Sequence, residues 1–430
     1  MPDVKVMAGR HRRVSVRQQV WFMNSKRVLV AAAIWTSLAG AVNPTFAQTW
    51  IPTATAPVTN WSSIASSADG MRLVAAGGQL VAYPAGRGNP AAPIYVSTNA
   101  GATWTKTTAP LAPWQSVASS ADGKRLAAVA YSGLVFTSTN GGSTWASNNP
   151  VMGVAWSAVA SSADGAKLAI AASGSGIYTS ANGGATWPSS DAPPTNWASL
   201  ASSADGSRMV AAQLGDYLNA NGAIYTSTNS GTTWSLTTAP GAAWFSVASS
   251  ADGSRLAAAA FHTNSLEPGL VYLSTNSGLT WAPSGAPPAY WTTVACSADG
   301  RKLVAAGSGA LYTSADFGAT WTSNSVPYQY WLSVASSADG SKLAIVANLD
   351  QIYTSASSPT PSLNSTLTGG NLILSWTLPS TKLVLRQNSD VATANWTDVP
   401  ANPTLTLTTL QYQVTVPLTN AQSFYRLESR

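Results

Sequence analysis

Cysteine, histidine and charged residues are scarce in this sequence, and each shortage excludes a class of protein. Its 430 residues include one cysteine and two histidines, and only 9% of them are charged. One cysteine cannot form an internal disulfide, and Cys296 stands where equivalent segments have serine, so we expect a small core residue rather than a reactive thiol. Only one histidine, His262, lies beyond residue 47, and without a second histidine or a cysteine cluster we expect no metal site and no cofactor.

Excess positive charge is confined to the N-terminus. Residues 1–47 hold seven of the 22 lysines and arginines and one acid, so the rest of the chain carries fifteen residues of each sign although the formal net charge is +6. A nucleic-acid partner or an anionic membrane surface is therefore not expected.

The N-terminal segment is organised like a secretory signal. Two cations precede a fifteen-residue apolar run that is short for a membrane span, and no later run is long enough to span one. Thr-Phe-Ala before position 48 resembles a small-residue cleavage site. We expect residues 1–47 to be a signal peptide cleaved after Ala47, with Met23 as the alternative start, and a mature protein that is secreted, periplasmic or on the cell surface.

Helix-forming patterns are also missing, and short alternating runs rich in Gly, Thr, Ser, Ala and Trp predict an all-β chain. One motif, in which Trp opens a small-residue strand followed by Asp-Gly, occurs seven times at intervals of 40 to 53 residues. Each repeat continues with a second apolar strand, a third strand similar to Ile-Tyr-Thr-Ser, a tight turn and a fourth strand that begins at Trp. Four strands per repeat of this length predict a seven-bladed β-propeller of four-stranded blades.

The aspartates of these repeats are predicted to be structural. Each Asp-Gly lies between two strands in the position of a two-residue hairpin turn, which needs positive φ. Catalytic carboxylates come as one unlike pair rather than as seven equivalents, so turn formation is favoured over catalysis. The seven residues are Asp69, Asp122, Asp164, Asp205, Asp252, Asp299 and Asp339.

The connection between the third and fourth strands carries a second motif, for example STNAGATW at 97–104 and SADFGATW at 314–321. It resembles the Asp-box, or BNR, repeat of the sialidase-type propellers, whose pattern is Ser-X-Asp-X-Gly-X-Thr-Trp. Asn replaces Asp in five of the six boxes, and because Asn can still bond to the turn backbone, the structural role survives without the charge. The box positions are Asn99, Asn140, Asn182, Asn229, Asn276 and Asp316.

Six boxes for seven blades leave one outer strand to be found. Thr49-Trp50 resembles the end of a box, and Trp50 precedes the first repeat Trp by 11 residues, within the 10 or 11 that separate every other box Trp from the next repeat Trp. We therefore expect an N-terminal strand to complete the last blade and close the ring, in a propeller that spans residues 48–355.

The repeats stop after residue 355. Residues 356–362 are rich in Ser and Pro and predict a linker, and residues 363–430 contain short β-patterned runs. These runs resemble the small C-terminal β-sandwich of secreted bacterial repeat proteins, with Trp376, Trp396 and Phe424 as its expected core.

Departures from the repeat fall at one end of the predicted propeller. Strands alternate direction within a blade, so the Asp-Gly turns and the boxes share one end, while the second-to-third loops and the blade connections share the other. Insertions at 77–93, 213–223 and 261–269 fall at that other end, and loops on a rigid scaffold commonly carry binding residues. The predicted binding face contains Tyr83, Arg87, Asp216, Tyr217, His262, Glu267, Tyr290, Tyr328 and Tyr330.

Catalytic residues are harder to find. The sialidase resemblance implies an arginine cluster, a tyrosine nucleophile paired with glutamate, and an acid/base aspartate, but the chain has only two glutamates, Glu267 and Glu428, and no Arg-Ile-Pro segment. A propeller glycosidase of the xyloglucanase type needs an aspartate pair, and no spacing singles one out. Within the predicted propeller, the carboxylates outside turns and boxes are Asp191, Asp216, Glu267 and Asp350.

The boxes also resemble those of the photosystem assembly-factor propellers, which implies a non-catalytic docking platform. We therefore predict an exported, monomeric binding or scaffolding propeller that recognises a glycan or a protein and has no integral membrane segment after cleavage. The alternative is a secreted glycoside hydrolase of sialidase-like or xyloglucanase-like type.

Overall fold

The computed structural model describes residues 48–53, 56, 60–78, 91–151, 153–215, 221–263, 267–348, 350–356, 363–368, 371–377, 383–389, 395–406, 411–417 and 424–429. The predicted signal peptide lies outside these residues, as do Tyr83, Arg87, Asp216 and Tyr217 of the predicted binding face. The described residues contain no helix of the length and hydropathy needed to cross a membrane.

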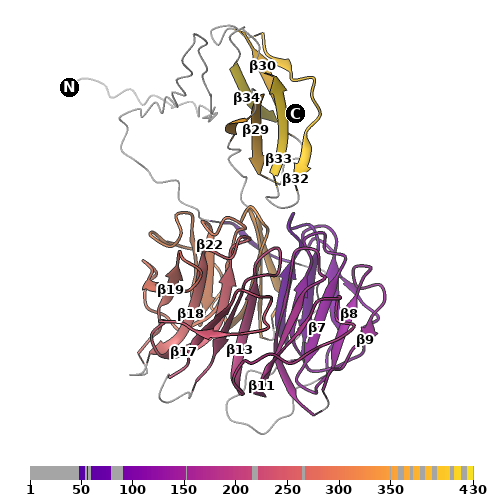
Figure 1. Ribbon diagram of the computed structural model, residues 1–430, viewed down its shortest axis with the longest axis vertical. Helices are drawn as coiled ribbons and strands as arrows, with labels where there is room; N and C mark the ends of the chain where they lie inside the picture. Colours follow the sequence, from indigo (N-terminus) through magenta and orange to yellow (C-terminus); the bar gives the residue numbers. More distant parts are fainter. Residues whose placement is uncertain are drawn as a thin grey trace, which may run out of the picture. The chain divides into compact units, whose positions relative to one another are not determined.

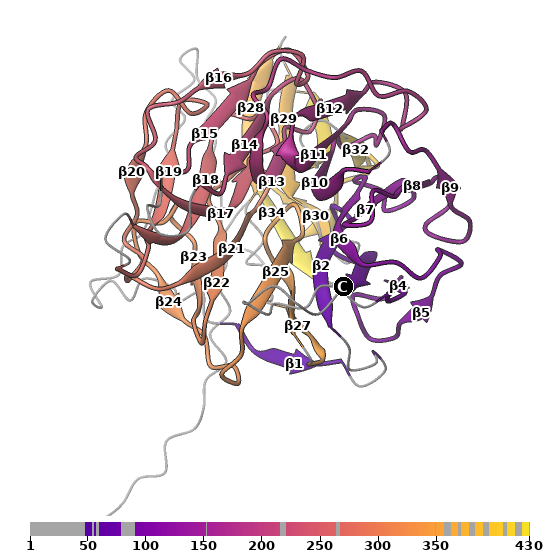
Figure 2. The same cartoon turned by 90° about the horizontal axis from the view of Figure 1, so that it is seen from below.

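Strands β1 to β27 form the predicted seven-bladed propeller, with the first strand of each blade innermost (Figure 2). Blade 1 is β2 (Trp61–Ser66), β3 (Leu73–Gly77), β4 (Ile94–Ser97) and β5 (Thr105–Lys106). Blade 2 is β6 (Trp114–Ser119), β7 (Leu126–Ala130), β8 (Val135–Ser138) and β9 (Ala146–Ser147). Blade 3 is β10 (Ala155–Ser161), β11 (Leu168–Ser175) and β12 (Ile177–Ser180), and blade 4 is β13 (Thr195–Ser202), β14 (Met209–Gln213), β15 (Ile224–Ser227) and β16 (Ser235–Leu236).

The remaining three blades follow the same antiparallel order. Blade 5 is β17 (Ala242–Ser249), β18 (Leu256–Thr263), β19 (Val271–Ser274) and β20 (Ala282–Pro283), and blade 6 is β21 (Trp291–Cys296), β22 (Leu303–Gly307), β23 (Leu311–Ser314) and β24 (Thr322–Ser323). Blade 7 is β25 (Trp331–Ser336), β26 (Lys342–Ala347), β27 (Ile352–Ala356) and β1 (Trp50–Pro52).

Closure by the N-terminal strand is confirmed. Trp50 pairs with Ser355 and Pro52 with Tyr353, so β1 is the outer strand of blade 7, and Figure 2 places it at the rim beside β27. Pairing the first and last segments of the propeller in one sheet covers an edge that would otherwise be open.

Blade 3 departs from the four-stranded pattern. Its second strand, β11, extends to pair with the start of β13, so that blades 3 and 4 form one seven-stranded sheet. Its fourth strand is reduced to a single bridge between Tyr178 and Ser189.

The repeat pattern forms blades because each position has one packing role. The second strands β3, β7 and β22 are buried along their whole length, which explains why they read as continuous small apolar runs. Every repeat Trp is at most 2% exposed and meets an aromatic ring of its own third strand edge to face, with centroids 5.3 to 5.8 Å apart. Such pairs contribute about 0.5–1.5 kcal/mol each beyond area burial.

A β-bulge follows the repeat Trp in each first strand. In blade 1 the pairing with β3 shifts between Trp61 and Ser63, and the same shift occurs at the equivalent place in the other six blades. A bulge inserts one extra residue and re-aims the side chains beside it. The residues at these bulges line the cavity described below.

Cys296 packs against the buried cluster around Trp291 and Val294. Burial, with a smaller contribution from the charge of Asp299, raises the pKa of its thiol to about 12. The thiol therefore stays protonated at neutral pH, as expected of a core residue rather than a nucleophile.

The C-terminal module consists of two antiparallel sheets, several of whose strands are labelled in Figure 1. One sheet has the order β28 (Asn364–Thr368), β29 (Asn371–Thr377), β33 (Gln411–Pro417) and β32 (Thr404–Thr406). The other has the order β31 (Thr397–Asp398), β30 (Leu383–Asn388) and β34 (Phe424–Ser429). Trp376 and Trp396 are buried as expected, and the side chain of Phe424 lies outside the described part of the chain.

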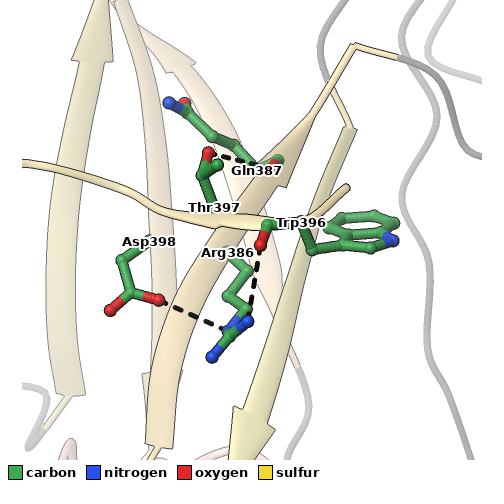
Figure 3. A network of polar contacts seen from close by, with 5 residues as sticks. All are labelled: Arg386, Gln387, Trp396, Thr397 and Asp398. Atoms are coloured by element: carbon green, nitrogen blue, oxygen red, sulfur yellow. Dashed lines mark hydrogen bonds and ion pairs between the residues drawn. The ribbon is translucent and has the colours of Figure 1, made fainter. Parts of the chain in front are cut away.

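The pairing of β30 with β31 carries the ion pair drawn in Figure 3. Arg386 Nε lies 3.3 Å from Asp398 Oδ1, and Arg386 Nη1 donates to the main-chain oxygen of Trp396 at 3.4 Å. Both charged side chains are partly exposed, at 34% and 47%, so the pair adds little stability and orients the strands rather than forming a site.

Candidate binding site at the mouth of the central channel

The Asp-Gly turns lock the seven blades together at one end of the channel. In each turn the alanine before Asp donates its N–H to the carbonyl of the equivalent alanine in the next blade, at 2.6 to 2.8 Å, and the last bond returns from Ala338 to Ala68. The box turns lie at the same end, since Ala100 N donates to Met71 O at 2.8 Å. We call this the box end. The circle of bonds runs through Ala68, Ala121, Ala163, Ala204, Ala251, Ala298 and Ala338.

The turn aspartates act through their carboxylates. Asp69 Oδ1 accepts from Ser67 Oγ at 2.6 Å and from Met71 N at 2.9 Å, and the other six repeat both bonds. The turn is longer than the predicted two-residue hairpin, because Ser67 N pairs with Arg72 O, and only the glycine takes positive φ, 68° at Gly70.

The glycines of these turns face the cation of the neighbouring blade. A Cβ at Gly165 would lie 2.6 Å from Arg125 Cβ, and equivalent contacts occur at the other six turns. Two lysines also reach the turn backbone, where Lys342 Nζ donates to Asp69 O at 2.8 Å and Lys302 Nζ to Asp339 O at 2.9 Å. The lysine and arginine side chains of the box end therefore make their contacts within the propeller.

The box turns are also satisfied internally. Asn99 Oδ1 accepts from Thr103 N at 2.9 Å, and Asn99 Nδ2 donates to Thr103 Oγ1 at 2.9 Å. In the one acidic box the second bond reverses, because Thr320 Oγ1 donates to Asp316 Oδ2 at 2.6 Å. Burial opposes ionisation of Asp316, but its hydrogen bonds from Thr320 and Ser314 hold its pKa below the ordinary value. The Asn amide and the Asp carboxylate thus hold the box turn by equivalent hydrogen bonds to the box threonine.

The other end of the channel, which we call the loop end, opens into a cavity of about 430 Å³. The two residues after each repeat Trp, where the bulge lies, supply most of its wall. Tyr131, Ser173, Asn196, Leu214 and Tyr330 add to the lining. None of the described residues lining the cavity is charged, so an uncharged ligand fits it best. The paired wall residues are Ser62, Ser63, Gln115, Ser116, Ser157, Ala158, Ala198, Ser199, Phe245, Ser246, Thr292, Thr293, Leu332 and Ser333.

A ring of hydroxyls runs around this wall. The second residue after the repeat Trp is Ser or Thr in six blades, and each hydroxyl accepts a main-chain N–H from the next blade at 3.1 to 3.2 Å. Ser63 accepts from Val117 N, for example. Blade 3 interrupts the ring, because Ala158 presents no hydroxyl to the N–H of Leu200.

An aromatic cluster flanks the cavity at blades 5 to 7. Phe245 and Phe261 stack with centroids 4.9 Å apart, Tyr290 lies 5.1 Å from Phe261, and Tyr330 lies 6.5 Å from it. Phe245 and Tyr330 also line the cavity. We call Phe245, Phe261, Tyr290 and Tyr330 the aromatic cluster.

The structure brings only some residues of the predicted binding face together. Tyr290 and Tyr330 join the aromatic cluster, and Tyr328, 80% exposed, lies beside it with its hydroxyl 3.3 Å from Ser308 Oγ. Glu267 is exposed in the loop after β18, whereas His262 is only 2% exposed, and its main chain forms a bridge to Pro268 in the same hairpin.

Of the spare carboxylates, Asp191, Glu267 and Asp350 lie in the described part of the chain, and none of them lines the cavity. Asp191 Oδ1 accepts from Trp234 N at 2.8 Å, beside the box turn of blade 4. Asp350 Oδ1 accepts from Gln351 N at 2.7 Å in the hairpin of blade 7, and burial together with Asp350 raises the pKa of Tyr353. Among the described residues, no group of three or more His, Cys, Asp and Glu could hold a metal.

Sequence reasoning missed Phe245, Phe261 and the hydroxyl ring. The signal for the ring is the Ser or Thr that stands two positions after the repeat Trp in six of the seven blades. The signal for Phe245 was a large ring at a position that is small or polar in most blades.

Comparisons with known proteins bear on the fold. No family model and no curated protein matches the chain. Among solved structures, YCF48 from Cyanidioschyzon merolae superposes with a TM-score of 0.52 at 15% identity, covering 71% of this chain and 98% of that one. A structure described as YCF48 bound to D1 peptide gives a TM-score of 0.53 at 16% identity, covering 72% and 97%. The chain is a β-propeller. At these identities the likeness extends to the fold alone.

Proposed function

We propose that this chain is an exported, non-catalytic recognition protein of the Asp-box propeller group, which binds an uncharged segment of a partner protein at the loop end. The observation that carries the proposal is the aromatic cluster at an uncharged cavity of about 430 Å³. Binding pockets of this size are lined mainly by apolar and aromatic side chains with a few polar groups that fix orientation.

The aromatic cluster suits protein recognition because aromatic rings supply most of the energy of many interfaces. The hydroxyl ring supplies polar groups around the same wall in every blade except blade 3, where Ala158 has no hydroxyl. A propeller of the same fold is described as bound to a peptide, which supports the choice of a protein segment over a glycan.

The hydrolase alternative needs two carboxyls about 5 to 10 Å apart on one pocket. Asp191 lies beside a box turn of blade 4, Glu267 is in a loop of blade 5, and Asp350 is engaged within the hairpin of blade 7. None of these three lines the cavity, and the fourth candidate, Asp216, lies outside the described residues. Binding without turnover is therefore the better-supported function.

The test is binding of the exported full-length protein to arrays of peptides, polysaccharides and cell-envelope fractions, with product release followed in the same wells. Phe261→Ala combined with Tyr330→Ala should weaken binding of the captured peptide by roughly 30-fold or more, because losing an aromatic hot spot costs about 2 kcal/mol or more.

The matched control is Leu236→Ala, which removes a side chain that is 64% exposed on the outer strand β16. It should leave binding unchanged. If only polysaccharides are captured, the ligand is a glycan and the proposed protein ligand is wrong. Released sugars that disappear with Glu267→Gln or Asp350→Asn would establish the hydrolase instead.

A further inference from the structure

Gln48 directly follows the predicted cleavage site and is 7% exposed. Its main-chain N donates to Asn324 Oδ1 at 2.9 Å, and Ser355 Oγ donates to its side-chain Oε1 at 2.5 Å. Its Nε2 is buried and has no hydrogen-bond partner among the described residues. The chain thus uses one N–H and one carbonyl of Gln48 and leaves its NH₂ group unsatisfied.

The two hydrogen-bond partners of Gln48 are neutral side chains that are themselves buried. Asn324 is 7% exposed and donates from Nδ2 to Thr313 Oγ1 at 3.0 Å, which holds its oxygen toward Gln48. Ser355 is 4% exposed on β27, the strand that pairs with β1. Neither hydrogen-bond partner of Gln48 carries a charge, so a newly released α-ammonium would be buried there without a charged partner among the described residues.

We propose that cleavage after Ala47 leaves Gln48 as the N-terminal residue and that Gln48 then cyclises to pyroglutamate. The α-amino nitrogen attacks Cδ, the Nα–Cδ bond forms, the Cδ–Nε2 bond breaks, and Nε2 leaves as ammonia with a proton taken from the amine. The ring keeps the N–H and the carbonyl that Asn324 and Ser355 bind, and it removes both the unpartnered NH₂ and the positive charge.

Cyclisation fits the role of this segment in closing the propeller. Strand β1 begins two residues later and is the only sequence-distant strand in its blade. A neutral, buried lactam anchors its start and gives aminopeptidases no free amine. The inference rests on the export proposed above and is independent of the ligand.

The first experiment is mass spectrometry of the N-terminal peptide from the exported full-length protein. The expected peptide begins at residue 48 and is lighter by one ammonia than the peptide with free glutamine. A peptide that begins with uncyclised Gln48 would overturn the cyclisation and leave export standing. A peptide that begins at Met1 or Met23 would overturn export and this inference together.

The second experiment tests whether the lactam occupies the pocket. Pyroglutamyl aminopeptidase should release it from the denatured protein and not from the folded protein, and equal release from both would overturn the buried position. Gln48→Asn cannot form the five-membered ring, so it should keep a free N-terminus and unfold at a lower temperature than the wild type. Thr49→Ser, a change at an exposed neighbour, should retain the lactam and the wild-type midpoint.

Discussion

The box end and the loop end are built from the same seven repeats, yet they differ in how evenly the repeats contribute. At the box end every blade supplies the same alanine, aspartate, glycine and cation, and the bonds among them close into a circle. At the loop end blade 3 lacks the hydroxyl, blades 3 and 4 merge, and blades 5 to 7 alone carry the aromatic cluster. Repetition therefore marks the structural end, and departure from it marks the end that we propose to bind the partner.

The largest expected effect comes from breaking the box end at a glycine. Gly165→Ala would place a Cβ 2.6 Å from Arg125 Cβ, at φ 69°, and Arg125 Cβ cannot move without its backbone. We expect a loss of about 2–3 kcal/mol in the free energy of unfolding, measured by chemical denaturation.

The chain offers a matched control for that glycine. Gly174 has a similar φ, 73°, but a Cβ there meets nothing within 4 Å. Gly174→Ala should therefore show only the backbone strain, about 1 kcal/mol. Equal losses at the two positions would mean that the contact with the neighbouring cation contributes nothing.

A smaller effect should follow from repairing the loop end. Ala158→Ser would supply the missing hydroxyl of the ring, in reach of the Leu200 N–H if blade 3 repeats the geometry of the other blades. We expect a gain of about 1 kcal/mol in the free energy of unfolding. Ala158→Cys has similar size and bonds weakly, so a gain of the same size there would show that filling space, not the hydrogen bond, is responsible.

Acid should weaken the box end through its aspartates. Hydrogen bonds from Ser203 and Ser207 lower the pKa of Asp205 to about 2. A lowered pKa in the folded state gives stability that is present above the unfolded pKa of about 3.9 and is lost as the pH falls through about 2. Asp205→Asn should make the loss of stability between pH 4 and 2 shallower, as followed by urea denaturation. An unchanged slope in Asp205→Asn would contradict this account.

The sequence predicts the box end far better than the loop end, for a physical reason. Seven copies of one motif predict the blades, the closing strand and the structural role of Asp69 and its equivalents. The length of the turn was wrong because it depends on Ser67 pairing with Arg72, which residue identity alone does not reveal. The aromatic cluster joins rings from positions 245 to 330, and only the closed geometry of the ring brings them together.

The smallest effect is expected at Asp316, the one box that keeps the carboxylate. Five sister boxes hold the same turn with Asn, whose Nδ2 replaces the bond that Thr320 Oγ1 makes to Asp316 Oδ2. Asp316→Asn should therefore change the free energy of unfolding by less than about 0.5 kcal/mol, and Asp316→Ala, which loses the bonds to Ser314 and Thr320, should cost more, about 1–2 kcal/mol. A large loss of unfolding free energy in Asp316→Asn would mean that this box needs its charge. The blades would then not contribute equally to the box end, and blade 6 would be the exception.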